Sequence, residues 1–172
     1  MRKTMTTALA FLVVGFFAVP LGWAQPHDDK ERAELAKALK DAKISLQQGV
    51  TASAKEGKPI SAKYEVEEGK LQLSVYTMKG DTFSEVIVDH KTGKVAKAEP
   101  ITKADDLKDA KAQREAMAKA KRSLDAAAGE AVRENKGFRA VSVMPTVKDG
   151  HPVADVALLK GTEWKTVSEK LD

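Results

Sequence analysis

The sequence predicts an α+β fold of tandem units, in which a long helix is followed by a three- or four-stranded antiparallel sheet. Two stretches carry apolar residues at spacings of three and four, the pattern of an amphipathic helix. After each stretch, apolar residues alternate with polar ones, and short turns containing glycine separate the runs, as in antiparallel hairpins. We therefore expect residues 25–102 to form a first unit and residues 103–172 a second unit.

The composition of the chain excludes several classes of protein. It has 172 residues, of which 42% are hydrophobic and 31% charged, as in a folded protein and unlike a disordered or multi-span membrane chain. The absence of cysteine excludes disulfide scaffolds, thiol catalysis and cysteine-ligated zinc. A net charge of +4 and an aromatic content of 5% are both too low to indicate a nucleic-acid partner.

Residues 1–24 have the three parts of a secretory signal peptide. Arg2 and Lys3 precede an apolar stretch over residues 8–19, which is shorter than the roughly 20 residues of a spanning helix. Gly22 and Ala24 then provide small side chains for cleavage after Ala24. Cleavage would leave 148 of the 172 residues with 27 basic and 25 acidic side chains, and no stable membrane anchor. The alternative is an uncleaved N-terminal anchor.

The first unit begins with a predicted helix and continues as hairpins. The helical stripe ends near Gly57-Lys58-Pro59, and its members are Leu35, Leu39, Ala42, Leu46 and Val50. Strands are predicted over residues 60–66, 71–75 and 82–89, with a short fourth strand around Val95. Glycine-containing turns lie between them at residues 68–70, 79–81 and 91–93.

The second unit has the same order of elements. Its helical stripe runs from Leu107 to Ala131 and ends near Gly137. Strands are predicted over residues 138–144, 153–159 and 164–167, with turns at 148–150 and 160–162.

An internal duplication explains this order. A shift of 78 aligns Ser45 and Leu46 with Ser123 and Leu124, whereas a shift of 81 aligns Gly69 and Val75 with Gly150 and Val156. We attribute the change of offset to three extra residues in the first strand pair. Chance similarity of two amphipathic segments is the alternative.

The first unit resembles the PepSY domain, which occurs in propeptides of secreted peptidases and in exported bacterial proteins. The resemblance covers residues 35–101 and is most specific where the strand over 82–89 ends in Asp89 and is followed by Thr92-Gly93. The second unit is similar to a degenerate copy that lacks this Asp-x-x-Thr-Gly pattern. The resemblance implies a binding or inhibitory module that acts on peptidases, and it implies no catalysis.

Asp89, Thr92 and Gly93 are predicted to have a structural role in a turn. An aspartate that leaves a strand can accept backbone N–H bonds in the turn that follows, and glycine can adopt positive φ before the next strand.

The histidines do not assemble a recognisable catalytic or metal motif. His27 would be the third residue after cleavage, but Pro26 has no N–H and so prevents an amino-terminal copper or nickel chelate. His90 and His151 fall in predicted turns, where solvated side chains are the usual case. The sequence leaves open whether either binds a metal. We predict no catalytic residue, no cofactor and no metal site.

These observations predict an exported, non-catalytic binding module in the periplasm or outside the cell. Its partner would be a protein, such as a peptidase or another envelope protein. Tyr76 and Met78 point away from the Leu71-Leu73-Val75 face, so they are candidates for an exposed partner surface. The alternative is that they pack against the other unit. The alternative function is a periplasmic protein that binds a small ligand or a metal ion.

Overall fold

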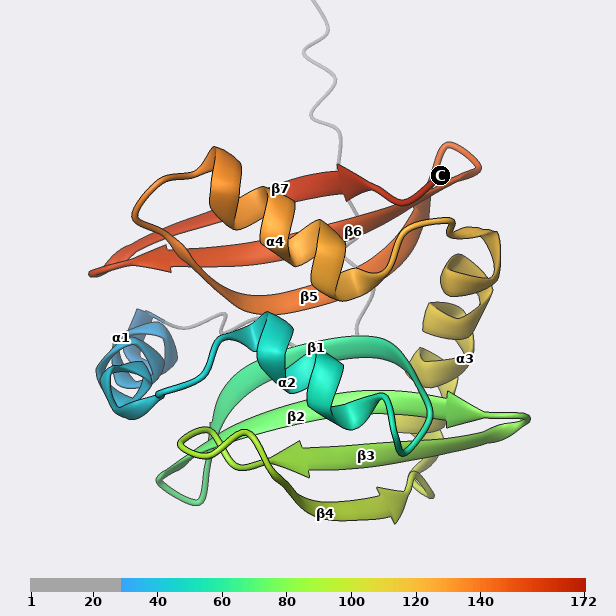
Figure 1. The fold of residues 1–172 in the computed structure, drawn as a ribbon, viewed down its shortest axis with the longest axis horizontal. Helices are drawn as coiled ribbons and strands as arrows, with labels where there is room; N and C mark the ends of the chain where they lie inside the picture. Colours follow the sequence, from blue (N-terminus) through green and yellow to red (C-terminus); the bar gives the residue numbers. More distant parts are fainter. Residues whose placement is uncertain (1–28) are drawn as a thin grey trace, which may run out of the picture.

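A single antiparallel sheet forms the centre of the molecule. The computed structural model describes residues 29–172, and its seven strands follow the order β4-β3-β2-β1-β5-β6-β7 (Figure 1). The first half (residues 29–102) contributes β1 (Lys58–Glu67), β2 (Lys70–Lys79), β3 (Thr82–Val88) and β4 (Val95–Pro100). The second half (residues 103–172) contributes β5 (Arg139–Lys148), β6 (His151–Lys160) and β7 (Glu163–Lys170).

The predicted architecture of tandem units with separate small sheets is therefore wrong. Strands β1 and β5 pair with each other through Ala62↔Val143 and Lys63↔Ser142, and this seam joins the strands of both halves into one sheet. The pattern of alternation within each strand does not show which strand of another segment lies beside it. This long-range pairing could therefore not be predicted from the alternation of apolar and polar residues.

The predicted long helices are each interrupted, which is a second correction. The first half has α1 (Asp29–Ala38), a short 3-10 helix η1 (Leu39–Asp41) and α2 (Leu46–Ser53). The second half has α3 (Ala104–Lys119) and α4 (Leu124–Glu134). Ser45 begins α2 because its hydroxyl accepts a bond from Gln48 N while the Gln48 side chain accepts one from Ser45 N. Ser123 occupies the same position before α4.

Helices pack on both faces of the sheet. Leu73 points towards α2, because a Cβ at Gly49 would lie 2.3 Å from Leu73 Cδ2. On the opposite face, Ser61 donates a hydrogen bond of 2.7 Å to Gln113 of α3. Figure 1 shows α2 and α4 in front of the sheet, with the hairpin of β2 and β3 passing in front of α3.

Helices α1 and α3 each reach the opposite half of the chain. Arg32 of α1 lies over the Trp164 ring of β7 at 5.7 Å, and Arg114 of α3 lies over the Phe83 ring of β3 at 5.5 Å. Trp164 and Phe83 both lie on the face of the sheet opposite to α2 and α4. The face that carries Tyr76 and Met78, the predicted partner surface, is therefore partly covered by the protein's own helices.

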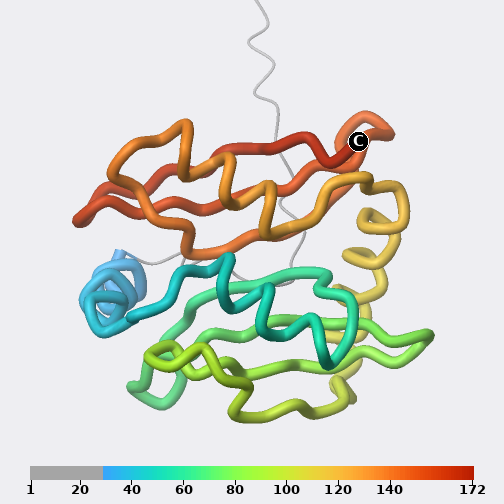
Figure 2. The backbone as a smooth tube through the Cα atoms, in the orientation of Figure 1, coloured from blue at the N-terminus to red at the C-terminus, as the bar shows by residue number. Residues whose placement is uncertain are grey.

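The two halves have matching connections. The His90 carbonyl accepts bonds from Lys43 N and Ile44 N, and the Leu171 carbonyl accepts bonds from Lys121 N and Arg122 N. The backbone path of Figure 2 shows in each half a helix lying across a hairpin. The hairpins β1–β2 and β5–β6 have strands of equal length, whereas α4 has 11 residues and α2 has 8. The three residues that change the offset from 78 to 81 therefore lie in the helix of the second half. The prediction that they lie in the first strand pair is wrong.

Candidate functional site

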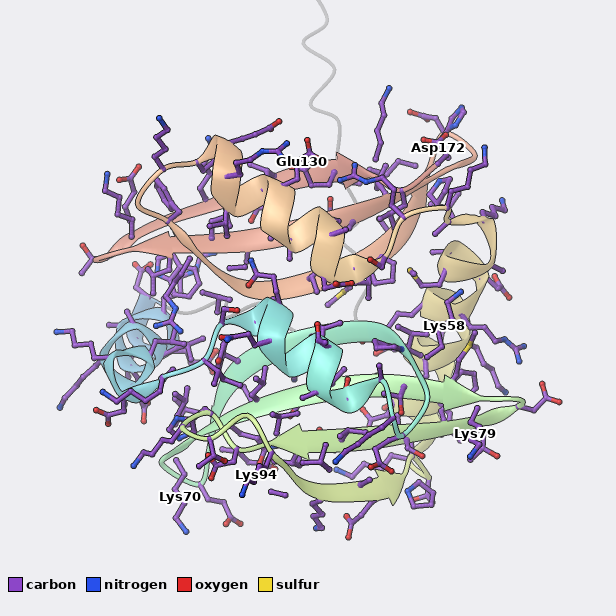
Figure 3. All side chains as sticks on the ribbon, in the orientation of Figure 1. Lys58, Lys70, Lys79, Lys94, Glu130 and Asp172 are labelled. Carbon is purple, nitrogen blue, oxygen red and sulfur yellow. The ribbon has the colours of Figure 1, made fainter. Side chains whose placement is uncertain are left out.

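A groove opens at one end of the sheet, where the β1–β2 turn and the β3–β4 turn lie close together. Lys70 and Lys94 mark this end in Figure 3. The groove has a volume of about 480 Å³, and we call it the end groove. Its apolar lining consists of Leu71, Ile87, Val88 and Ala96, and its charged lining includes Glu67, Glu68, Asp89 and Lys70.

Backbone pairing explains why the end groove exists. The β2–β3 ladder stops at Leu73↔Val88, which leaves Leu71 and Gln72 beyond the last pair. Chain direction then changes, because Asp89 N donates to Lys94 O at 2.8 Å and Asp89 O accepts from Gly93 N at 2.8 Å. The start of β2 and the end of β3 therefore border the groove from two sides.

Asp89 fixes the turn beside the groove. One carboxylate oxygen of Asp89 accepts bonds from Lys91 N at 2.9 Å and Thr92 N at 2.7 Å, and Gly93 has a φ of +73°. The Thr92 hydroxyl accepts a bond from Lys94 N at 3.4 Å. The backbone bonds from Thr92 and Lys91 hold the pKa of Asp89 below its usual value, so the carboxylate is charged at neutral pH.

A polar network continues from the groove along the sheet. The Gln72 amide donates to Glu67 at 2.9 Å and to the Ser74 hydroxyl at 3.0 Å, and Ser74 donates to Glu65 at 2.7 Å. Lys63 lies 2.6 Å from the second carboxylate oxygen of Glu65. These bonds hold the Glu67 and Gln72 side chains in place at the rim of the groove.

Burial makes one further carboxylate of this network harder to ionise. Desolvation raises the pKa of Glu85, while the hydrogen bond from Ser74 opposes that rise. Glu65 repels the Glu85 charge and Lys63 attracts it.

The histidines lie apart from one another. His90 lines the end groove, and within residues 29–172 its Nδ1 atom is buried with no hydrogen-bond partner. His151 Nδ1 lies 2.7 Å from Asp172 Oδ2, and this contact lowers the pKa of the Asp172 carboxyl. The described part of the chain has no group of three or more His, Cys, Asp and Glu residues arranged to hold a metal ion. His27 and the predicted signal peptide lie outside the described residues.

Tyr76 and Met78 do not form an exposed surface. Tyr76 is only 5% exposed, and Met78 is partly buried against the hydrophobic core. Tyr76 pairs with Ser61 and Met78 with Phe83, and both of these partners contact α3 of the second half. The side chains therefore pack between the halves, so this exposed-patch candidate for a partner surface is wrong.

The end groove was missed at the sequence level because its lining comes from both hairpins of the first half. One local signal was present. The β1–β2 turn contains Glu68-Gly69 where the β5–β6 turn contains Asp149-Gly150, and Glu68 adopts a φ of +49°, which glutamate rarely occupies. The turn itself does not require a long carboxylate side chain at position 68.

Comparisons with known proteins give no family for this chain. No family model and no curated protein matches it. A crystal structure from Clostridium difficile 630, described as "a putative lipoprotein", is similar over 77% of this chain and 89% of its own, with 12% identity and a TM-score of 0.42. Among residues 29–172, no helix is long and apolar enough to span a membrane.

Proposed function

We propose that the protein is an exported, non-catalytic module that binds a peptidase or another envelope protein through the end groove. The observation that carries this proposal is the convergence of two turns on one open groove with a mixed apolar and charged lining. The resemblance of the first unit to PepSY and the predicted signal peptide support the peptidase partner and the export. The matching connections of the halves support the predicted duplication.

Large exposed apolar side chains do not mark a second protein-binding surface among the described residues. Val147 is their one large hydrophobic side chain counted as exposed, at 39%. Contiguous exposed apolar patches are the usual mark of a protein-binding surface, and a single valine is not one. The partner contact is therefore proposed to combine charge with the small apolar lining of the groove.

Site-specific photo-cross-linking in the native envelope tests this function. We expect Ile87→p-benzoylphenylalanine, in the groove lining, to form a covalent adduct with one envelope protein. The matched control is Ser168→p-benzoylphenylalanine, 81 positions later on β7, which should give no adduct. Equal adducts from both positions, or none from either, would contradict the proposal.

A small ligand or a metal ion is the second candidate. The volume of about 480 Å³ is within the range of small-molecule sites, and carboxylates and an imidazole are among the lining groups. Thermal-shift titration with metal ions and anionic or cationic metabolites separates the two functions. A saturable rise in Tm with one of these compounds, without an adduct at position 87, would favour the second candidate.

A further inference from the structure

The end groove is absent from the corresponding end of the second half. There the β6–β7 ladder continues to Val153↔Lys170, and Leu171 N then donates to Pro152 O at 3.0 Å. The counterparts of Leu171 and Pro152, 81 positions earlier, are His90 and Leu71, and within the described residues no backbone bond joins them. The same hairpin end is therefore closed in one half and open in the other.

The closed end shows what kind of structure fills such a space. An extended segment at the end of the chain completes it: Leu171 is fully buried, and Asp172 pairs with His151 at 2.7 Å. This closure combines a main-chain hydrogen bond, one buried apolar side chain and one side-chain contact. An extended segment is thus the shape of chain that suits the end of this hairpin.

Two charged positions differ in sign between the two ends. Glu67 and Asp89 of the end groove correspond to Lys148 and Lys170 at the closed end. With Glu68, the groove lining has three carboxylates against one ammonium group, that of Lys70. An occupant with positive charge is therefore favoured over one with negative charge.

We propose that the end groove binds an extended protein segment that carries lysine or arginine side chains. This inference rests on the proposed function and specifies the chemistry of its partner. The aliphatic stem of a lysine or arginine would lie against Ile87, and its head would reach the carboxylates at the rim.

Glu68 permits a test that separates binding from folding. Its φ of +49° lies in the left-handed region, which asparagine occupies more readily than glutamate. Glu68→Asn therefore removes a rim carboxylate without weakening the turn. Asp149→Asn is the matched control, because Asp149 has a φ of +52° at the equivalent place in the second half.

The experiment uses the ¹⁵N-labelled protein and two blocked peptides, acetyl-Gly-Lys-Leu-Lys-Leu-Lys-Gly-amide and its counterpart with glutamate in place of lysine. We expect the lysine peptide to shift the amide signals of Gln72, Ile87 and Ala96 but not those of Val153 and Ser168. Glu68→Asn should weaken its binding about two- to fivefold, as for an exposed ion pair, with no fall in Tm. Asp149→Asn should leave the affinity unchanged.

Equal binding of the glutamate peptide, shifts confined to other residues, or no shift at millimolar peptide would overturn the inference. An adduct from Ile87→p-benzoylphenylalanine together with no lysine-peptide binding would overturn the inference and leave the proposed function intact. Peptide binding in the groove together with no adduct in the envelope would support the inference and contradict the proposed function.

Discussion

The β3–β4 turn depends on the backbone conformation of Gly93, whose φ is +73°. A Cβ at this position would meet Ile44 Cγ2 at 3.5 Å, which is ordinary contact, so the left-handed backbone is the main obstacle to a side chain. We expect Gly93→Ala to lower the free energy of unfolding by about 1–2 kcal/mol. Urea denaturation measures this change.

Substitution of Gly129 by alanine should have the opposite effect on stability, and it serves as the control. It lies inside α4, and a Cβ there would meet nothing within 4 Å. Gly129→Ala should raise the free energy of unfolding by about 0.5–1 kcal/mol, because alanine favours the helix. Equal effects of the two substitutions would contradict the role assigned to Gly93.

Tyr64 makes stability sensitive to alkaline pH. Burial raises its pKa to about 12, although the nearby Arg139 opposes the rise, and its hydroxyl donates to Ile44 O at 2.9 Å. The unfolded chain loses the tyrosine proton near pH 10, whereas the folded protein retains it until about pH 12. The stabilisation of the folded protein by protonated Tyr64 is therefore complete below pH 10. Roughly 2–3 kcal/mol of it is lost as the pH rises to 12.

The Tyr64→Phe variant tests this dependence. At neutral pH we expect a loss of about 1 kcal/mol from the missing hydrogen bond to Ile44 O. Between pH 10 and 12 the variant should lose less stability than the wild-type protein, as measured by urea denaturation at each pH. Parallel losses in both proteins would show that Tyr64 does not titrate in this way.

At the scale of elements, the start of α2 depends on the capping box of Ser45 and Gln48. Ser45→Ala should cost about 1 kcal/mol of stability, because it removes the acceptor for Gln48 N. Ser123→Ala is the matched control, since the Ser123 side chain makes no capping bond to α4 and its loss should cost less. Far-UV circular dichroism during urea denaturation measures both. A larger cost at Ser123 would contradict the assignment.

The strands and turns were predictable, and the helix interruptions were predictable only in part. Glycines at residues 69, 80, 93, 150 and 161 all adopt positive φ in the turns between strands, so local turn chemistry located the hairpins. The apolar stripe of Leu39, Ala42 and Leu46 continued across the break before α2, because residues on both sides of it face the same core. Ser45 with Gln48 was the signal that a new helix begins.

At the scale of the whole molecule, the position of each side chain relative to the other half could not be predicted. In the alternation along β2, Tyr76 falls on the side that carries polar residues. It is nevertheless buried, because α3 of the second half covers that face. The end groove likewise depends on where the ladder between β2 and β3 stops. Both features arise from contacts between segments far apart in sequence, which alternation within one segment does not report.

The two halves should unfold in one transition. The seam between β1 and β5 has only two registered pairs, but Arg139 of β5 also donates to Leu39 O at 2.8 Å, and Lys58 of β1 donates to Met117 O at 3.4 Å. We expect Trp164 fluorescence and far-UV circular dichroism to give the same urea midpoint. A separate early transition of Trp164 would contradict this coupling.

The hydrogen bond between Ser61 and Gln113 tests the coupling of the halves at one contact. Both residues are almost fully buried, so loss of either partner leaves the other polar group buried without its bond. Gln113→Leu and Ser61→Ala should each cost about 1–3 kcal/mol. The double variant should cost less than the sum of the two by about 1–2 kcal/mol, because no unpaired group remains. Additive costs would mean that this contact does not couple α3 to the sheet of the first half.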